Sequence, residues 1–297
     1  GTTVLPWEEA APARSSRRRR QPDTEPAPPR GGRNVPAAVG MSLLLGGGVA
    51  ASLLFRKEIF IAVAAAAVIL AIWELAGALS AKRIAIPVIP LGVGAVGMLV
   101  SAYAAGQEGL IVSFTLTAFG VVLWLVIDGL QGAVRDIAGS VFTAAYVPFL
   151  AAFAVLMVAQ DDGPMRVITF FLVVFASDTG GYLAGVMFGK HPMAPTVSPK
   201  KSWEGFAGSA VACLVVGAVA VNQLLDGAVA AGLALGAATV VVATMGDLGE
   251  SLIKRDLGIK DMSSILPGHG GMMDRLDSLL ATAPVAFLLL AWLVPVA

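Results

Sequence analysis

Nine apolar stretches of about 20 residues each dominate this chain and decide what it can fold into. That length lets an α-helix cross the roughly 30 Å hydrocarbon core of a bilayer while satisfying its own backbone hydrogen bonds. Charged residues make up only 13% of the chain, against about 25% in a soluble domain. We therefore predict an all-α, polytopic membrane bundle of about nine transmembrane helices, at residues 37–55, 59–80, 84–104, 110–128, 139–159, 165–188, 205–225, 228–247 and 279–296.

The first stretch is interrupted by Gly46, Gly47 and Gly48, so eight spans, or ten, are alternatives. Basic residues test the topology, because lysine and arginine collect in short cytoplasmic loops. With the N-terminus inside, all of the 20 basic residues except Arg56, Lys57 and Arg166 fall on the cytoplasmic side. We therefore expect a multi-pass protein of the cell membrane (inner or plasma membrane) whose N-terminus and main polar segments face the cytoplasm.

Residues 1–36 are rich in arginine and proline and have no hydrophobic period that could bury a core. We expect a disordered cytoplasmic tail, whose run Arg17–Arg20 either touches anionic lipid or serves only as a topology determinant. Residues 37–297 form the predicted membrane domain. Within it, residues 37–160 are expected to be mainly scaffold and residues 165–297 to carry the active site.

Several kinds of site are excluded or disfavoured by the sequence. Cys213 is the only cysteine and the chain has two histidines, which excludes zinc sites built on these residues. The run Gly92-x-Gly94-x-x-Gly97 spells a dinucleotide-binding motif, but it lies inside an apolar span, where small residues are typical of close helix packing. We expect the lipid bilayer and no nucleic acid as a macromolecular partner.

Three polar patches remain on the predicted cytoplasmic side. The first is the segment 177–182, inside the span 165–188, where the charge of Asp178 costs about 2.5–3.5 kcal/mol and usually faces a polar cavity or a partner. A hydrogen-bonded helix contact is the alternative. The second is the loop 190–205, in which Lys200 and Lys201 suit phosphate oxygens, or else serve only as topology charges. Glu204 is ambiguous between a helix-cap interaction and a functional carboxylate.

The third patch runs from residue 246 to residue 278, between two apolar spans. If the helix continues past residue 247, Asp247, Glu250, Ser251 and Lys254 lie at i, i+3, i+4 and i+7 on one face. Asp274, Asp277 and Ser278 repeat this spacing at the start of the last span. Carboxylates without thiolates or an imidazole cluster suit Mg²⁺, and surrounding cations suit a nucleoside triphosphate. The alternative is a salt-bridged surface loop.

The third patch resembles the signature of the phosphatidate cytidylyltransferases, also called CDP-diacylglycerol synthases. The segments 177–179 and 198–205 also resemble polar segments of that family, with Ser202 where threonine is common, whereas the N-terminal half has no comparable motif. The signature resemblance rests on Ser251, Lys254, Arg255, Lys260, Asp261, Ser263, Leu266, Pro267, His269, Gly270, Gly271, Asp274, Arg275 and Asp277.

The resemblance implies that phosphatidate attacks the α-phosphorus of CTP, giving CDP-diacylglycerol and pyrophosphate. We predict Asp247 and Asp274 as the leading ligands of Mg²⁺, or of Mn²⁺. Asp178, Asp277 and Glu250 are supporting candidates for the same ion or for a second cation. Cationic or orienting roles in catalysis are predicted for Lys254, Arg255, Lys260, His269 and Arg275. Substrate contacts are predicted for Lys200, Lys201, Ser202, Glu204, Ser251, Asp261, Gly270 and Gly271.

Two other functions are alternatives. A CTP-dependent kinase of a lipid alcohol would use the same charges on the γ-phosphate and release CDP. An ion-coupled transporter would need inverted repeats with helices broken at mid-membrane, whereas the polar groups gather here at one face. A homodimer is suggested only by the small-residue faces of the helices, such as Gly181, Gly185 and Gly189.

Overall fold

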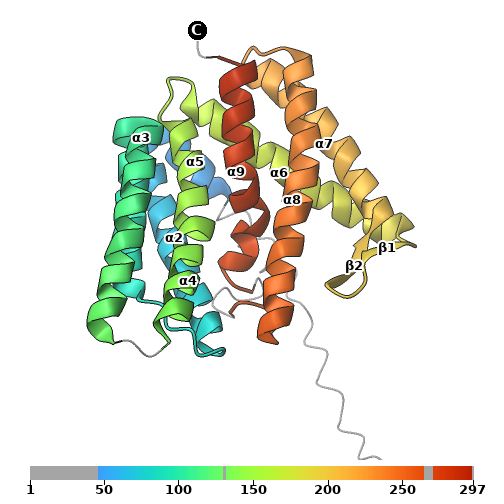
Figure 1. Ribbon diagram of the computed structural model, residues 1–297. Coiled ribbons are helices and arrows are strands. Elements are labelled where there is room, and N and C mark those ends of the chain that lie inside the picture. Colours follow the sequence, from blue (N-terminus) through green and yellow to red (C-terminus); the bar gives the residue numbers. More distant parts are fainter. Residues whose placement is uncertain (1–45, 130–131, 264–269, 296–297) are drawn as a thin grey trace, which may run out of the picture. The chain divides into compact units, whose positions relative to one another are not determined.

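A computed structural model of the chain describes residues 46–129, 132–263 and 270–295 (Figure 1). The predicted tail 1–36 lies outside these residues. Seven helices in the described part are long and apolar enough to cross a membrane, which confirms the all-α polytopic fold. They are α2 (Lys57–Ser80), α3 (Val88–Asp128), α4 to α5 (Ala133–Val158), α6 (Gly163–Phe188), α7 (Trp203–Leu224), α8 (Val229–Leu257) and α9 (Met273–Leu293).

Helix α3 is two antiparallel arms rather than one rod. A straight helix of its 41 residues would be about 60 Å long, twice the thickness of the bilayer core. At Gly106 the backbone leaves the helical region, with φ 64° and ψ −148°. The chain then turns back, so that Gly94 on the first arm packs directly against the side chain of Thr117 on the second. The two arms match the predicted spans 84–104 and 110–128.

Counting these arms separately, the seven helices give eight crossings, which correspond to eight of the predicted spans. The remaining span, 37–55, lies only partly within the described residues. Its described part is a short apolar helix, Gly46–Phe55. The total of nine crossings therefore stays a prediction.

Contacts between distant segments show that the crossings alternate in direction. At one end of the bundle the backbone N–H of Met272 reaches Glu74, that of Ala85 reaches Asp136, and Lys201 pairs with Asp247. We call this end the polar end. At the other end Lys57 donates to the carbonyl of Gln160, and Arg166 donates to that of Val294. The loops whose lysines and arginines are predicted to be cytoplasmic share the polar end.

Backbone contact holds α6, α7 and α8 together. A Cβ on Gly180 would lie 2.8 Å from the carbonyl oxygen of Gly208, and one on Gly217 would lie 2.5 Å from that of Gly232. Gly181 and Gly185 likewise face α7 of the same chain, against Ser209 and Gly205. Because these small-residue faces are used inside the chain, they give no support to the predicted homodimer, which stays a prediction.

Two short strands interrupt the helices at the polar end. Strand β1 (Pro192–Ala194) pairs antiparallel with β2 (Ser198–Ser202), and the hairpin leads directly into α7. The sequence predicted only a loop at this position. The hairpin holds the second polar patch beside α8, as described below.

Candidate active site

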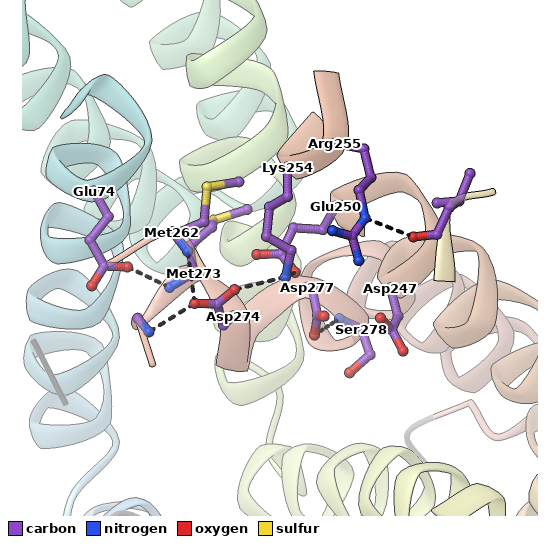
Figure 2. A network of polar contacts seen from close by, with 12 residues as sticks. Glu74, Asp247, Glu250, Lys254, Arg255, Met262, Met273, Asp274, Asp277 and Ser278 are labelled. Atoms are coloured by element: carbon purple, nitrogen blue, oxygen red, sulfur yellow. Dashed lines mark hydrogen bonds and ion pairs between the residues drawn. The ribbon is translucent and has the colours of Figure 1, made fainter. Parts of the chain in front are cut away.

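The third polar patch folds into the junction between α8 and α9. The two helices approach closely at Gly246, where an added Cβ would lie 2.7 Å from the carbonyl oxygen of Asp277. This contact brings the last turns of α8 beside the first turns of α9. Figure 2 shows Asp274, Lys254, Asp277 and Asp247 following one another across the junction. The structure thus places together the carboxylates that the helical spacing put on two separate faces.

Lys254 lies at the centre of this junction. Its Nζ donates to Glu250 Oε2 at 2.9 Å and to Asp274 Oδ1 at 2.8 Å, and so joins α8 to α9. The Lys254 side chain is 15% exposed and that of Glu250 is fully buried. An ammonium group removed from water needs such partners, because desolvation of an unpaired charge costs several kcal/mol.

Asp274 organises the turn before α9. Its Oδ2 accepts hydrogen bonds from the backbone N–H of Gly271 at 2.8 Å and of Met262 at 3.1 Å. Its Oδ1 faces Lys254. One oxygen of this carboxylate therefore fixes the local backbone, while the other is held by an ammonium group.

Asp247 has a similar partner from a different element. Lys201, at the end of β2, places its Nζ 2.5 Å from Asp247 Oδ2. A second contact between the hairpin and α8 is a hydrogen bond of 3.2 Å from Arg255 Nε to the carbonyl of Val197. The β1–β2 hairpin is therefore attached to the face of α8 that carries the carboxylates.

Two predicted substrate contacts also serve local structure. The Ser202 hydroxyl accepts a hydrogen bond from the N–H of Gly205 and caps the start of α7. Glu204 accepts from the N–H groups of Lys190 and His191, and its Oε1 lies 2.6 Å from His191 Nδ1. Glu204 thus closes the base of the hairpin.

The carboxylates of Glu250 and Asp277 have fewer described hydrogen-bond donors than that of Asp274. Glu250 Oε1 is buried and has no hydrogen-bond partner among the described residues. Asp277 is an electrostatic neighbour of Glu250, and its Oδ1 accepts from the N–H of Ser278 at 2.6 Å. Asp247 and Asp178 are electrostatic neighbours of Asp277. Two buried carboxylates that face each other are costly unless a cation or a shared proton lies between them.

This donor set fits a hard divalent cation completed by other ligands. In the described part of the chain, no three acidic, histidine or cysteine side chains converge into a ready-made metal cage. Mg²⁺ commonly binds through one or two carboxylates and takes its remaining ligands from water and substrate phosphates. The orphaned oxygen of Glu250 beside Asp277 meets that requirement without a complete cage.

The other predicted residues surround this junction. Lys200, Arg255, Lys260, Asp261 and Arg275 are exposed, and Ser251 is half-buried on α8. Gly270 has φ 76°, as expected of a glycine in a tight turn. Exposed Asp178, on α6, lies within electrostatic range of Lys201 and Arg275. His269 lies outside the described residues.

Two residues of the N-terminal half also reach the site, and the sequence analysis missed both. Glu74 of α2 accepts hydrogen bonds from Ser263 Oγ and from the N–H groups of Met272 and Met273. Tyr146 lies in the π-helix η1 (Ala145–Phe149) and is an electrostatic neighbour of Glu250, Asp277 and Asp247. A signal for Glu74 was present, because an acid inside an apolar span is the feature that singled out Asp178.

Comparison with known proteins identifies the family of this chain. Residues 37–293 match the sequence model of the cytidylyltransferase family. The chain belongs to this family. Similar family members are phosphatidate cytidylyltransferases of Mycobacterium leprae, 39% identical over 89% of this chain and 90% of the relative, and of Mycobacterium bovis, 37% identical over 95% of each. That of Staphylococcus aureus strain COL is 32% identical over 75% of this chain and 86% of the relative.

Gly271 is expected to tolerate alanine poorly in this turn of the cytidylyltransferase. A Cβ there would lie 2.6 Å from Glu74 Oε2 and 3.1 Å from Asp274 Oδ2. Gly271→Ala should therefore lower the free energy of unfolding by about 1–3 kcal/mol, as overpacking does elsewhere. Gly77→Ala is the matched control, because Gly77 has open space around it and alanine is a better helix former by up to about 1 kcal/mol. Thermal unfolding in micelles checks both, and equal melting temperatures would contradict the packing.

Proposed function

We propose that this protein transfers the cytidylyl group of CTP to phosphatidate, giving CDP-diacylglycerol and pyrophosphate. The observation that carries the proposal is the alternation of carboxylates and ammonium groups across the α8–α9 junction, with Asp274 and Glu250 on either side of Lys254. Membership of the cytidylyltransferase family over residues 37–293 supports it, as do relatives named phosphatidate cytidylyltransferase.

The position of the site at helix ends suits both substrates. Phosphatidate keeps its acyl chains in the bilayer and its phosphate at the interface, whereas CTP arrives from the aqueous side. The polar end of the bundle lies where the two meet. We place this end in the cytoplasm, at the cell membrane, since it carries Lys82, Arg83, Arg135, Lys190 and Lys200 in or beside its short loops.

The chemistry is a displacement at the α-phosphorus of CTP. An oxygen of the phosphatidate phosphate forms the new P–O bond, and the bond from the α-phosphorus to the oxygen of the β-phosphate breaks. Pyrophosphate leaves with the electron pair. Because the nucleophile is already an oxyanion, little general-base help is needed, and catalysis rests on positioning and charge neutralisation.

Cations of the site supply that neutralisation. Lys254 and Lys201 form ion pairs with Asp274 and Asp247. Arg255, Lys260 and Arg275 are exposed and lie within the third polar patch. We assign these groups to the triphosphate and the lipid phosphate, with Lys200 closing from the hairpin. His269 is proposed to orient a phosphate.

Asp247 and Asp274 would hold Mg²⁺ or Mn²⁺, supported by Asp178, Asp277 and Glu250, with room in this set for a second cation. When bound, the ion would neutralise charge on the phosphates and stabilise the pyrophosphate leaving group. Asp247 Oδ2 and Asp274 Oδ1 are each paired with a lysine ammonium. A bound triphosphate would attract both lysines, which would leave these two oxygens available to a metal ion.

Metal removal tests this assignment. The purified protein is expected to lose CDP-diacylglycerol formation when EDTA is added and to recover it when Mg²⁺ is restored, because the carboxylates repel the triphosphate when no divalent cation lies between them. Product formation is followed by extraction of the lipid, and released nucleotide is followed by chromatography. Activity that persists in excess chelator would contradict the metal assignment, and release of CDP would favour the lipid-kinase alternative.

A further inference from the structure

Glu74 is a buried carboxylate in a half of the chain that carries no recognisable motif. It lies in α2, is 2% exposed, and has Trp73 and Leu75 as its sequence neighbours. Its Oε1 accepts hydrogen bonds from Ser263 Oγ at 2.6 Å and from the N–H of Met272 at 2.9 Å. Its Oε2 accepts from the N–H of Met273 at 2.8 Å. These three donors offset the cost of burying a carboxylate charge inside an apolar helix.

The backbone donors are those that α9 cannot satisfy itself. The first N–H groups of any α-helix have no partner within the helix and carry its positive partial charge. Here Asp274 takes the N–H of Gly271, and Glu74 takes those of Met272 and Met273. Helix α9 is therefore capped from another helix, by a residue nearly 200 positions earlier in the chain.

The same two carboxylates hold the chain on the other side of residues 264–269. Met262 N–H donates to Asp274, and Ser263 Oγ donates to Glu74. Residues 262–263 and residues 271–273 lie on either side of residues 264–269. Each of these two segments is thus hydrogen-bonded to both Glu74 and Asp274. Figure 2 shows Glu74 approaching this turn from α2, on the side of Asp274 away from Asp247.

We propose that Glu74 is a positioning residue of the active site. It fixes the start of α9 so that Asp274 keeps one oxygen on the backbone of the turn and directs the other toward Lys254. Glu74 makes its described hydrogen bonds to the turn, and we assign it no contact with the phosphates. This role rests on the proposed function, since it assigns Glu74 to the placement of Asp274 for that reaction.

Glutamine is a sharp test of this role, although it has nearly the same shape. Both oxygens of Glu74 face a backbone N–H, Oε1 that of Met272 and Oε2 that of Met273. In either orientation the NH₂ group of a glutamine meets a donor, so one N–H of α9 loses its partner. A purely space-filling role would be kept by Glu74→Gln.

Leu75→Ala is the matched control, because Leu75 is the next residue of α2 and is fully buried in the core. This variant loses stability but removes no hydrogen bond to the turn. Both variants are studied as the full chain in micelles, well below their melting temperatures. The measurements are hydrogen exchange of the peptide that covers residues 271–276, and kcat with CTP and phosphatidate.

Glu74→Gln is expected to accelerate exchange in this peptide and to lower kcat by about 10–100-fold, the usual effect of losing a residue that orients a ligand. Leu75→Ala should melt earlier but keep wild-type exchange in the peptide and wild-type kcat. Wild-type exchange in Glu74→Gln, or a kcat no lower than in Leu75→Ala, would overturn the proposal. If the wild-type protein makes no CDP-diacylglycerol, the proposed function fails, and the exchange measurement still decides whether Glu74 fixes the turn.

Discussion

Asp274→Asn is expected to lower kcat for CDP-diacylglycerol formation by about 100–1,000-fold or more, while the protein keeps its fold. The asparagine carbonyl can still accept from Gly271 and Met262, so the turn keeps its backbone partners. Its NH₂ group then faces Lys254 in place of an oxygen, and the negative charge is gone. Asp247→Asn should have a comparable effect, because it removes the charge opposite Lys201.

Asp256→Asn is the control for these two variants. Asp256 lies on the same helix, α8, but is exposed, and it has no role in the proposed site. It should keep wild-type kcat. Thermal unfolding and circular dichroism establish that each variant is folded. Wild-type turnover in both Asp247→Asn and Asp274→Asn would remove these carboxylates from the reaction.

Lys254→Met is expected to cost both stability and activity. Removing one partner of a buried ion pair usually destabilises a protein by about 3–5 kcal/mol, because the remaining charge stays buried without compensation. Here two charges lose their partner, the fully buried Glu250 and Asp274, whose side chain is 11% exposed. Melting temperature in micelles and kcat at a temperature where the variant is folded measure the two losses.

The double variant Glu250→Gln/Lys254→Met separates these losses. Neutralising Glu250 removes one uncompensated charge, so part of the lost stability should return. Activity should not return, because the cation beside Asp274 is still missing. A double variant as unstable as Lys254→Met would contradict the assignment of Glu250 and Lys254 as a buried ion pair. Recovery of turnover would contradict a catalytic role for Lys254.

Much of this architecture was predictable because a membrane limits what an apolar stretch can do. Each crossing needs about 20 apolar residues, so even the arms of α3 were predicted as two spans around Gly106. Helical spacing also placed Asp247, Glu250 and Lys254 on one face of α8, and the structure joins Glu250 to Lys254.

Other features depend on contacts that no local pattern encodes. Glu74 meets Met272 only because α2 packs beside the start of α9, and no spacing rule reaches that far along the chain. The β1–β2 hairpin depends on Glu204 closing its base, although the sequence alone gave Glu204 two readings. Likewise, Gly181 and Gly185 indicated close helix packing, but only the fold shows that the partner is α7 of the same chain.

The fate of the phosphates of CTP tests the central claim most directly. Purified protein is given phosphatidate and CTP labelled either at the α-phosphorus or at the γ-phosphorus. The proposed reaction predicts that the α-label enters the lipid and that the γ-label is released as pyrophosphate in an equal amount. Transfer of the γ-label to lipid with release of CDP would contradict this reaction. So would the absence of labelled lipid with both labelled forms of CTP.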